Sequence, residues 1–212
     1  MQESLFSLTN FILVLTAYIS YRAFQNRGEL EKWIFSPYLI KKNQEYYRFL
    51  SSGLIHANGM HLVLNLFALY MFGNMVEMFF YAQFPNAGRT LYMLLYFGGM
   101  IAADIVPYLR NENNPAYRSL GASGAVSAVV FSFILFAPLA PMSFIFVPFV
   151  KFPAIVLGVL YLAYSYYASR NISDGIGHEA HLFGGLFGLA FTIIADPSVF
   201  ASFLEQIRTL LP

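Results

Sequence analysis

The sequence predicts an all-α membrane protein, a compact bundle of six transmembrane helices with a long membrane-associated first loop. The first observation is composition: 58% of the 212 residues are hydrophobic and only 11% are charged, against roughly 25% in typical soluble domains. A soluble domain with so few charges could not cover its apolar surface. The net charge of +1 excludes a strongly basic nucleic-acid binder, and the lack of cysteine excludes disulfides, iron–sulfur clusters and a cysteine nucleophile.

The second observation is a series of apolar runs. Because a helix needs about 20 mostly apolar residues to cross the hydrocarbon, the runs predict six spans within a single domain, 1–212. The predicted spans cover residues 5–23, 61–82, 89–109, 120–137, 154–170 and 180–196. Residues 24–60 form the only long hydrophilic stretch, and prolines after the fourth span stop an over-long helix. The first residues lack a basic n-region, so we expect no cleavable signal peptide.

The basic residues favour an external N-terminus. With a cytoplasmic N-terminus, only Arg89, Lys151 and Arg208 of the twelve basic residues would lie inside. The positive-inside rule opposes that arrangement. The rule carries less weight if the long first loop packs into the membrane as a folded element.

The third observation is a set of polar residues within the predicted spans, where they are costly and therefore candidates for function. The second span opens with His61 and Asn65, four residues apart on one helical face. The fourth span opens with Ser123, and the sixth holds His181 in its first turn. Spans two, four and six run in the same direction, because two crossings separate each from the next. These four side chains are therefore expected at a similar depth on one side of the membrane.

Small residues predict that the fourth and sixth spans pack closely. They recur at four-residue spacing, as Gly124, Ala128, Gly184 and Gly188, a pattern that lets two helix backbones approach. If these faces meet, Ser123 and His181 come within hydrogen-bond reach. A serine hydroxyl becomes a nucleophile when a base takes its proton, and a neutral imidazole is the usual base. Glu179 points away from His181 on a helix, so a dyad is favoured over a triad.

Each polar residue also has a structural interpretation. A lone serine in a transmembrane helix often only bonds a backbone carbonyl, and a lone histidine can be a hydrogen-bonded bundle residue. We expect Glu77 and Asp104 to make hydrogen bonds at helix ends, and His56 and His178 to lie at the membrane interface or to support the site indirectly. The histidine pair of the sixth span is one residue too close for the H-E-x-x-H zinc motif.

The ordered motifs resemble those of the rhomboid intramembrane serine proteases, in their basic six-helix form, over essentially the whole chain. Residues 121–124 (GASG) resemble the family's G-x-S-G nucleophile motif, and residues 180–188 (AHLFGGLFG) resemble A-H-x-x-G-x-x-x-G. His56, His61 and Asn65 match the H-x4-H-x3-N pattern of the second helix.

The resemblance implies an intramembrane serine endopeptidase that cleaves single-span membrane proteins in or near their transmembrane segment through an acyl-enzyme. Ser123 would attack the peptide carbonyl, and His181 would act as general base and then as acid. The oxyanion would be stabilised by the His61 and Asn65 side chains and the Ser123 N–H, with Gly121 giving close backbone approach. The implied partners are these substrates and the lipid bilayer, with no cofactor, metal or nucleic acid. The first loop and a mobile fifth helix are the implied route of substrate entry.

Two features depart from the family. Many members carry an aromatic residue four positions after the serine that stacks on the catalytic imidazole, but Ser127 stands there, so another residue must orient His181. The family's usual orientation, with a cytoplasmic N-terminus and the site facing outward, opposes the count of basic residues. We adopt the family's orientation, because a first loop folded into the outer leaflet violates the assumptions of the positive-inside rule. We also expect a multi-pass protein of a bacterial inner membrane.

Two other functions stay open. The first is a catalytically silent rhomboid-like protein that binds membrane helices, although such relatives typically lack the serine or the histidine and this chain keeps both. The second is a metal or proton transporter that uses the four histidines, at positions 56, 61, 178 and 181. Its activity would vanish with a chelator and survive Ser123→Ala.

Overall fold

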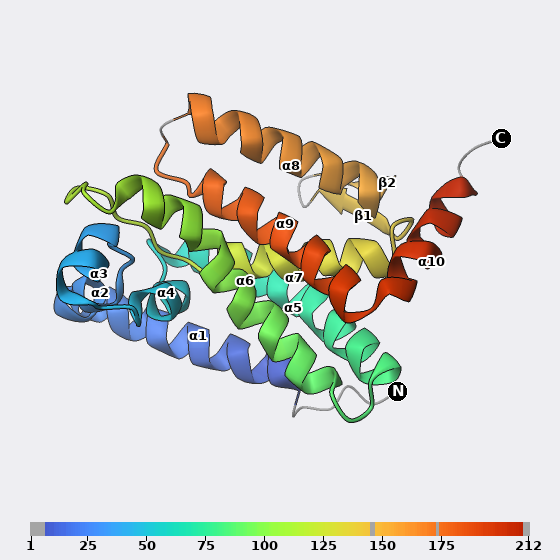
Figure 1. Cartoon of the computed structure of the whole chain (residues 1–212), viewed down its shortest axis with the longest axis horizontal. Coiled ribbons are helices and arrows are strands. Elements are labelled where there is room, and N and C mark those ends of the chain that lie inside the picture. Colours follow the sequence, from blue (N-terminus) through green and yellow to red (C-terminus); the bar gives the residue numbers. More distant parts are fainter. Residues whose placement is uncertain (1–6, 145–146, 173, 210–212) are drawn as a thin grey trace.

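The computed structural model describes residues 7–144, 147–172 and 174–209. In this part the chain is mostly helical, with one short 3₁₀ helix and one β-hairpin (Figure 1). The α-helices are α1 (Leu8–Gln25), α2 (Arg27–Trp33), α3 (Pro37–Asn43), α4 (Arg48–Ser51), α5 (Gly59–Gln83), α6 (Gly88–Asn111), α7 (Ser123–Phe136), α8 (Ala154–Asn171), α9 (His178–Ala195) and α10 (Pro197–Arg208). The 3₁₀ helix covers Ser52–Leu54, and the strands are β1 (Pro141–Phe144) and β2 (Val147–Pro153).

Each of the six predicted spans coincides with a helix, namely α1, α5, α6, α7, α8 and α9. Within the described residues, α5, α6 and α9 are long and apolar enough to cross a membrane by length and composition. Helix α7 is apolar but has only 14 residues, about 21 Å of helix at 1.5 Å per residue. The prediction of a helical membrane protein is therefore confirmed, and a count of six crossings stays a prediction.

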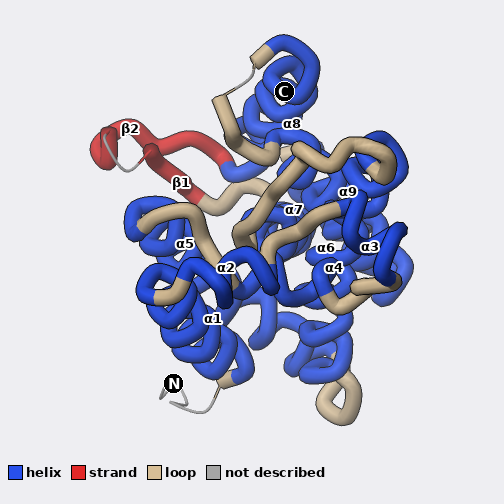
Figure 2. The backbone as a smooth tube through the Cα atoms, turned by 90° about the vertical axis from the view of Figure 1, so that its left-hand side faces the viewer, coloured by secondary structure: helices blue, strands red, loops and turns tan. Residues whose placement is uncertain are grey.

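Helix α7 forms the centre of the bundle. It packs against α5, α6 and α9, while α1 packs on α5 and α8 packs on α9. Figure 2 looks along the bundle and places α7 among these neighbours. Helices α5, α7 and α9 run in one direction, and α1, α6 and α8 run in the other (Figure 1). The N-terminal turns of α5, α7 and α9 therefore lie at one end of the bundle, as the alternation of spans predicted.

The predicted close packing of small residues is confirmed. A Cβ added at Gly184 of α9 would overlap the backbone carbonyl of Gly124 in α7, and one added at Gly188 would overlap that of Ala128. Gly124 itself lies against the Cβ of Ala103 in α6. The backbones of α7 and α9 therefore meet directly, and α6 approaches α7 through the small side chain of Ala103.

The hydrophilic stretch after α1 is folded, with α2, α3, α4 and the 3₁₀ helix at the end of the bundle where α7 begins (Figure 1). Its central residue is Arg48, which is only 4% exposed. The guanidinium donates to the carbonyls of Ile34 at 2.6 Å and Glu31 at 3.0 Å, and its Nε pairs with Glu45 at 2.5 Å. One buried cation thus satisfies backbone groups from separate turns of the loop.

The hairpin of β1 and β2 was not predicted from the sequence. The prolines between residues 138 and 153 do end α7, but the segment then forms an antiparallel pair in which Pro141 lies opposite Pro153. Figure 2 shows this hairpin projecting from the side of the bundle. The hydrogen bonds between the two strands pair backbone N–H and C=O groups that a continued helix would have paired within itself.

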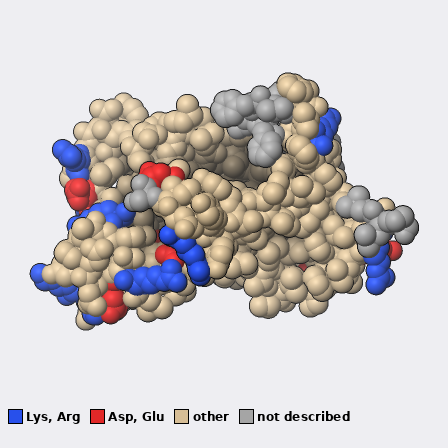
Figure 3. All heavy atoms as spheres, turned by 90° about the horizontal axis from the view of Figure 1, so that it is seen from above, with Lys and Arg blue, Asp and Glu red and all other residues tan. Residues whose placement is uncertain are grey.

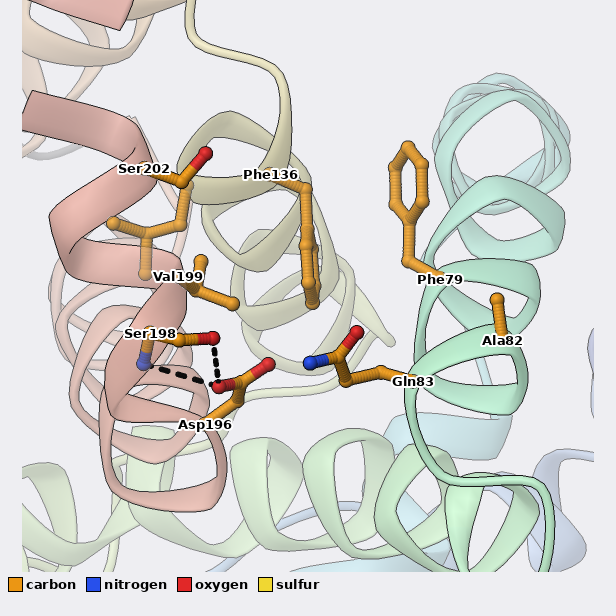
Figure 4. Close-up of a pocket in the computed structure, with 9 residues that line it drawn as sticks. Phe79, Ala82, Gln83, Phe136, Asp196, Ser198, Val199 and Ser202 are labelled. Carbon is orange, nitrogen blue, oxygen red and sulfur yellow. Dashed lines mark hydrogen bonds between the residues drawn. The ribbon is translucent and has the colours of Figure 1, made fainter. Parts of the chain in front are cut away.

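Helix α10 was also not predicted. It begins with Pro197 after the cap residue Asp196, whose carboxylate accepts from the Ser198 N–H at 3.1 Å and the Ser198 hydroxyl at 2.6 Å. A pocket of about 270 Å³ lies between α10 and the ends of α5 and α7, with Gln83 and Asp196 in its wall (Figure 4). This pocket is at the end of α7 opposite Ser123.

Charged side chains gather towards the two ends of the molecule, and the broad surface between them is uncharged on the face in Figure 3. Two acidic residues of the helices are buried. Glu77 accepts from the Leu8 N–H at 2.8 Å and from the Thr9 N–H and hydroxyl at 2.9 Å, so it caps the start of α1 as predicted. Asp104 of α6 forms no hydrogen bond with the described residues, so its predicted role at a helix end is not observed.

Candidate active site

Ser123 is the first residue of α7 and is half-buried at the end of the bundle. The loop before it is bound to the folded first loop by backbone pairing. Phe35 and Ser119 form an isolated antiparallel bridge, with N–H to carbonyl distances of 2.9 and 3.2 Å. The N–H of Gly121 donates to the carbonyl of Ser52 at 2.9 Å. The first loop therefore holds the backbone that leads into Ser123.

His56 adds a side-chain contact to the same loop. It is fully buried, its Nε2 accepts from the N–H of Ala122 at 3.3 Å, and its Nδ1 lies 2.9 Å from the hydroxyl of Ser20. Burial lowers the pKa of His56 to about 3, with a further contribution from His61, so the imidazole is neutral and accepts this hydrogen bond. His56 is a buried support of the nucleophile loop, which agrees with the second of its two expected places, an indirect support of the site, and not with the first, the membrane interface.

His61 and Gly121 are in direct contact. Gly121 has a φ of +120°, which only glycine adopts readily, and a Cβ at this position would lie 2.5 Å from Cε1 of His61. The His61 ring also packs edge-to-face on His56, with centroids 4.9 Å apart. Asn65 is buried and donates to the carbonyl of His61 at 2.9 Å. The structure thus brings His61, Asn65 and Gly121 together beside the start of α7.

His181 lies in the first turn of α9, three residues before Gly184 and so on the same face. The contact of Gly184 with Gly124 brings this turn against the first turn of α7, where Ser123 lies. No hydrogen bond joins the Ser123 hydroxyl to the His181 imidazole among the described residues. The two side chains are on adjoining helix ends, and the proton transfer that a dyad needs requires them to move into contact.

Tyr161 of α8 was missed by the sequence analysis. Its ring stacks on the His181 imidazole, with centroids 5.9 Å apart and planes 23° from parallel. Its hydroxyl lies 2.9 Å from Oγ of Ser127. Ser127 was the signal in the sequence that the usual aromatic residue is missing. Because α8 holds several tyrosines, the sequence did not indicate which of them contacts His181.

His178 is buried beside His181, and the two rings meet edge-to-face at 6.0 Å. Its Nε2 lies 3.1 Å from a carboxylate oxygen of Asp174. The Ile176 N–H and the His178 imidazole hold the pKa of Asp174 below its usual value. Glu179 instead contacts Arg110 of α6, in agreement with the expectation that it points away from His181.

The start of α7 also supplies backbone hydrogen-bond donors beside these side chains. A helix that begins at Ser123 leaves the N–H groups of its first turn without helical partners, and such groups stabilise negative charge. A hydroxyl, an imidazole and these donors lie at one end of the bundle. Within the described residues, no cluster of three or more histidine, aspartate or glutamate side chains has the geometry of a metal site.

Comparison with known proteins identifies the family of the chain. Residues 43–197 match the family model of the Rhomboid domain. The chain is 29% identical over 209 residues to Rhomboid-like protein 11, chloroplastic, of Arabidopsis thaliana, covering 93% of this chain and 68% of that protein. It is 30% identical over 95 residues to Rhomboid protease GlpG of Haemophilus influenzae, covering 44% of this chain and 43% of that protein. The matched domain holds every residue of the candidate site, and the chain belongs to the rhomboid family.

Proposed function

We propose that this protein is an intramembrane serine endopeptidase. The observation that carries the proposal is the direct contact of Gly124 with Gly184, which sets the turns that bear Ser123 and His181 against each other. Family membership adds support, because one relative is named a rhomboid protease. Other relatives are named rhomboid-like, so the catalytic reaction itself has to be argued from the residues.

In the proposed reaction, the Ser123 hydroxyl attacks the carbonyl carbon of a peptide bond while the His181 imidazole takes its proton. The tetrahedral intermediate collapses to an acyl-enzyme as His181 returns the proton to the leaving amine. A water molecule then loses a proton to His181 and attacks the ester carbonyl. The second tetrahedral intermediate collapses to the carboxylic acid product as His181 returns that proton to the Ser123 oxygen. The site lies at helix ends, where water can approach, which suits the hydrolytic half of the cycle.

The negative charge on the carbonyl oxygen would be stabilised beside Gly121. The candidate donors are the Ser123 N–H, the second Nδ2 hydrogen of Asn65, and the imidazole of His61. The N–H of Gly121 is an unsuitable donor because it already binds the Ser52 carbonyl at 2.9 Å. Gly121 contributes instead by leaving room for His61, since any side chain there would meet its ring.

The proposed substrates are single-span membrane proteins cut in or near their transmembrane segment, with the bilayer as the medium. We propose a cytoplasmic N-terminus and a site end that faces outward. The proposal is compatible with the count of basic residues if charges at this end of the bundle are offset by ion pairs. Arg22 at the end of α1 pairs with Glu29 of α2 at 2.5 Å, and Lys41 of α3 pairs with Glu112 after α6 at 2.7 Å. Two relatives are named chloroplastic and mitochondrial, and another is from Haemophilus influenzae, so the bacterial inner membrane stays a prediction.

The second candidate is a protein that binds membrane helices without cutting them. One observation favours it: the Ser123 hydroxyl and the His181 imidazole are not hydrogen-bonded to each other. In the absence of substrate such bonds are often long in active enzymes as well, so a chemical test of the serine decides between the two.

The deciding experiment is labelling of the detergent-purified chain with a serine-reactive fluorophosphonate, beside Ser123→Ala, His181→Ala and the control Ser169→Ala. Ser169 is a half-buried serine whose hydroxyl donates to the carbonyl of Tyr166 in its own helix at 2.8 Å. We expect labelling of the wild type and Ser169→Ala, and none of the two site variants. Equal, weak labelling of all four folded proteins would rule out an activated Ser123 and favour the helix-binding protein.

A further inference from the structure

We infer that Tyr161, held by Ser127, is the positioning residue that aligns the His181 imidazole with Ser123. The inference rests on the proposed peptidase function, since it assigns how the base of that reaction is oriented. Its starting point is the environment of His181. Within the described residues the imidazole forms no hydrogen bond, and no carboxylate contacts it. Its aromatic neighbours are the stacked ring of Tyr161 and the edge of His178.

A flat ring against one face of the imidazole restricts rotation about its χ2 angle. The centroid distance of 5.9 Å and interplanar angle of 23° match an offset-stacked aromatic pair. The contact selects among imidazole orientations without using either ring nitrogen. Both ring nitrogens therefore stay free, including the one that exchanges a proton with Ser123.

Tyr161 is itself fixed to the helix that carries the nucleophile. Ser127 is four residues after Ser123, so both hydroxyls lie on one face of α7. The buried Ser127 Oγ lies 2.9 Å from the Tyr161 hydroxyl, and the tyrosine ring also packs on Phe131 of α7 at 6.0 Å. Helix α7 thus positions the nucleophile directly and the base through a ring supplied by α8.

This arrangement makes the dyad depend on the position of α8. Helix α8 lies at the edge of the bundle, and Tyr161 is 38% exposed in the protein alone. A shift of α8 away from α7 would break the contact with Ser127 and uncover one face of His181 in the same movement. The structure therefore couples the placement of a peripheral helix to the alignment of the base.

The test compares four variants of the full chain in detergent. Tyr161→Leu removes the ring, Tyr161→Phe keeps the ring but removes the hydroxyl, and Ser127→Ala removes only the partner of that hydroxyl. The control is Tyr167→Leu, the same substitution on an exposed tyrosine of α8 that is 58% exposed. Thermal unfolding identifies any variant that fails to fold.

The first measurement is the rate of fluorophosphonate labelling at rising reagent concentrations. We expect Tyr161→Leu to lower the limiting rate about tenfold or more, while the half-saturating concentration stays within about twofold. Tyr161→Phe and Ser127→Ala remove the same hydrogen bond but keep the ring, so both should lower the limiting rate by a similar factor, smaller than that of Tyr161→Leu. Wild-type rates for a folded Tyr161→Leu would overturn the inference while leaving the peptidase proposal intact.

The second measurement does not depend on catalysis. Diethyl pyrocarbonate acylates imidazole, and mass spectrometry of the digested chain reports acylation at each histidine. We expect faster modification of His181 in Tyr161→Leu than in the wild type or Tyr167→Leu, because one ring face is uncovered. Unchanged modification of His181 would overturn the inference. A wild type that is not labelled by fluorophosphonate would count against the peptidase proposal instead, and the modification experiment would still test the role of Tyr161.

Discussion

Gly184 of α9 packs against the backbone carbonyl of Gly124 in α7, the residue that follows Ser123. A Cβ at position 184 would lie 2.8 Å from the Gly124 carbonyl carbon and 2.9 Å from its Cα. These are backbone atoms, so no flexible side chain can move to make room. The distance between the two helices at the candidate site is therefore set by the absence of one methyl group.

Substituting Gly184 should separate α7 from α9. For Gly184→Ala we expect a loss of stability of roughly 1–3 kcal/mol, typical of overpacking, and a loss of fluorophosphonate labelling of about tenfold or more. The matched control is Gly59→Ala at the start of α5, where an added Cβ meets nothing within 4 Å. Thermal unfolding and labelling of both variants check the prediction, and equal behaviour of the two would contradict it.

Alanine substitutions at Gly121 and Gly175 distinguish the effect of backbone strain from the effect of a clash with His61. Both have positive φ, +120° and +78°, so alanine strains either backbone by about 1–3 kcal/mol. Only at Gly121 would the new Cβ meet a side chain, since nothing lies within 4 Å at Gly175. We expect Gly121→Ala to abolish labelling and Gly175→Ala to retain it. Loss of labelling in both variants would show that strain alone accounts for the effect.

His56 makes the stability of the fold depend on pH. Its pKa falls from an ordinary 6.5 to about 3 in the folded chain, so below pH 6.5 the unfolded chain binds a proton that the folded chain does not. Stability is then full above pH 6.5 and is lost as the pH falls, by about 2 kcal/mol at pH 5. Thermal unfolding in detergent at pH 5 and pH 7.5 measures this loss.

The control for this prediction is His56→Gln, which keeps a side chain able to accept from the Ala122 N–H but does not titrate. We expect the variant to be less stable than the wild type at pH 7.5 and to lose less stability on acidification. An identical pH dependence in both proteins would assign the effect to other groups.

Much of the bundle could be predicted from composition and spacing. Apolar runs predicted all six long helices, because a chain in hydrocarbon must pair its backbone N–H and C=O groups with each other, as a helix does. The four-residue spacing of Gly184 and Gly188 predicted which helices approach closely. Such a spacing places small residues on one face of a single helix, so it can be recognised in a short stretch of sequence. The alternation of spans predicted that Ser123 and His181 lie at the same end.

The hairpin at Pro141–Phe144 and Val147–Pro153 could not be predicted in this way. Prolines in the sequence showed where α7 must stop, but pairing of two strands depends on backbone groups that carry no residue-specific signal. The sequence left the role of His56 open, between the membrane interface and indirect support of the site, for a related reason. Its contact with the Ala122 N–H joins residues 66 apart in the chain, and no local pattern encodes such a pair.

By itself the sequence determined the class of protein, the helices and the end of the bundle at which its polar groups gather, because these follow from hydropathy and helical periodicity. Only the tertiary structure decided which aromatic ring covers His181. Tyr161 and His181 belong to different helices, and the stack depends on how α8 lies against α7 and α9. That placement results from packing of many side chains at once, which no single motif carries.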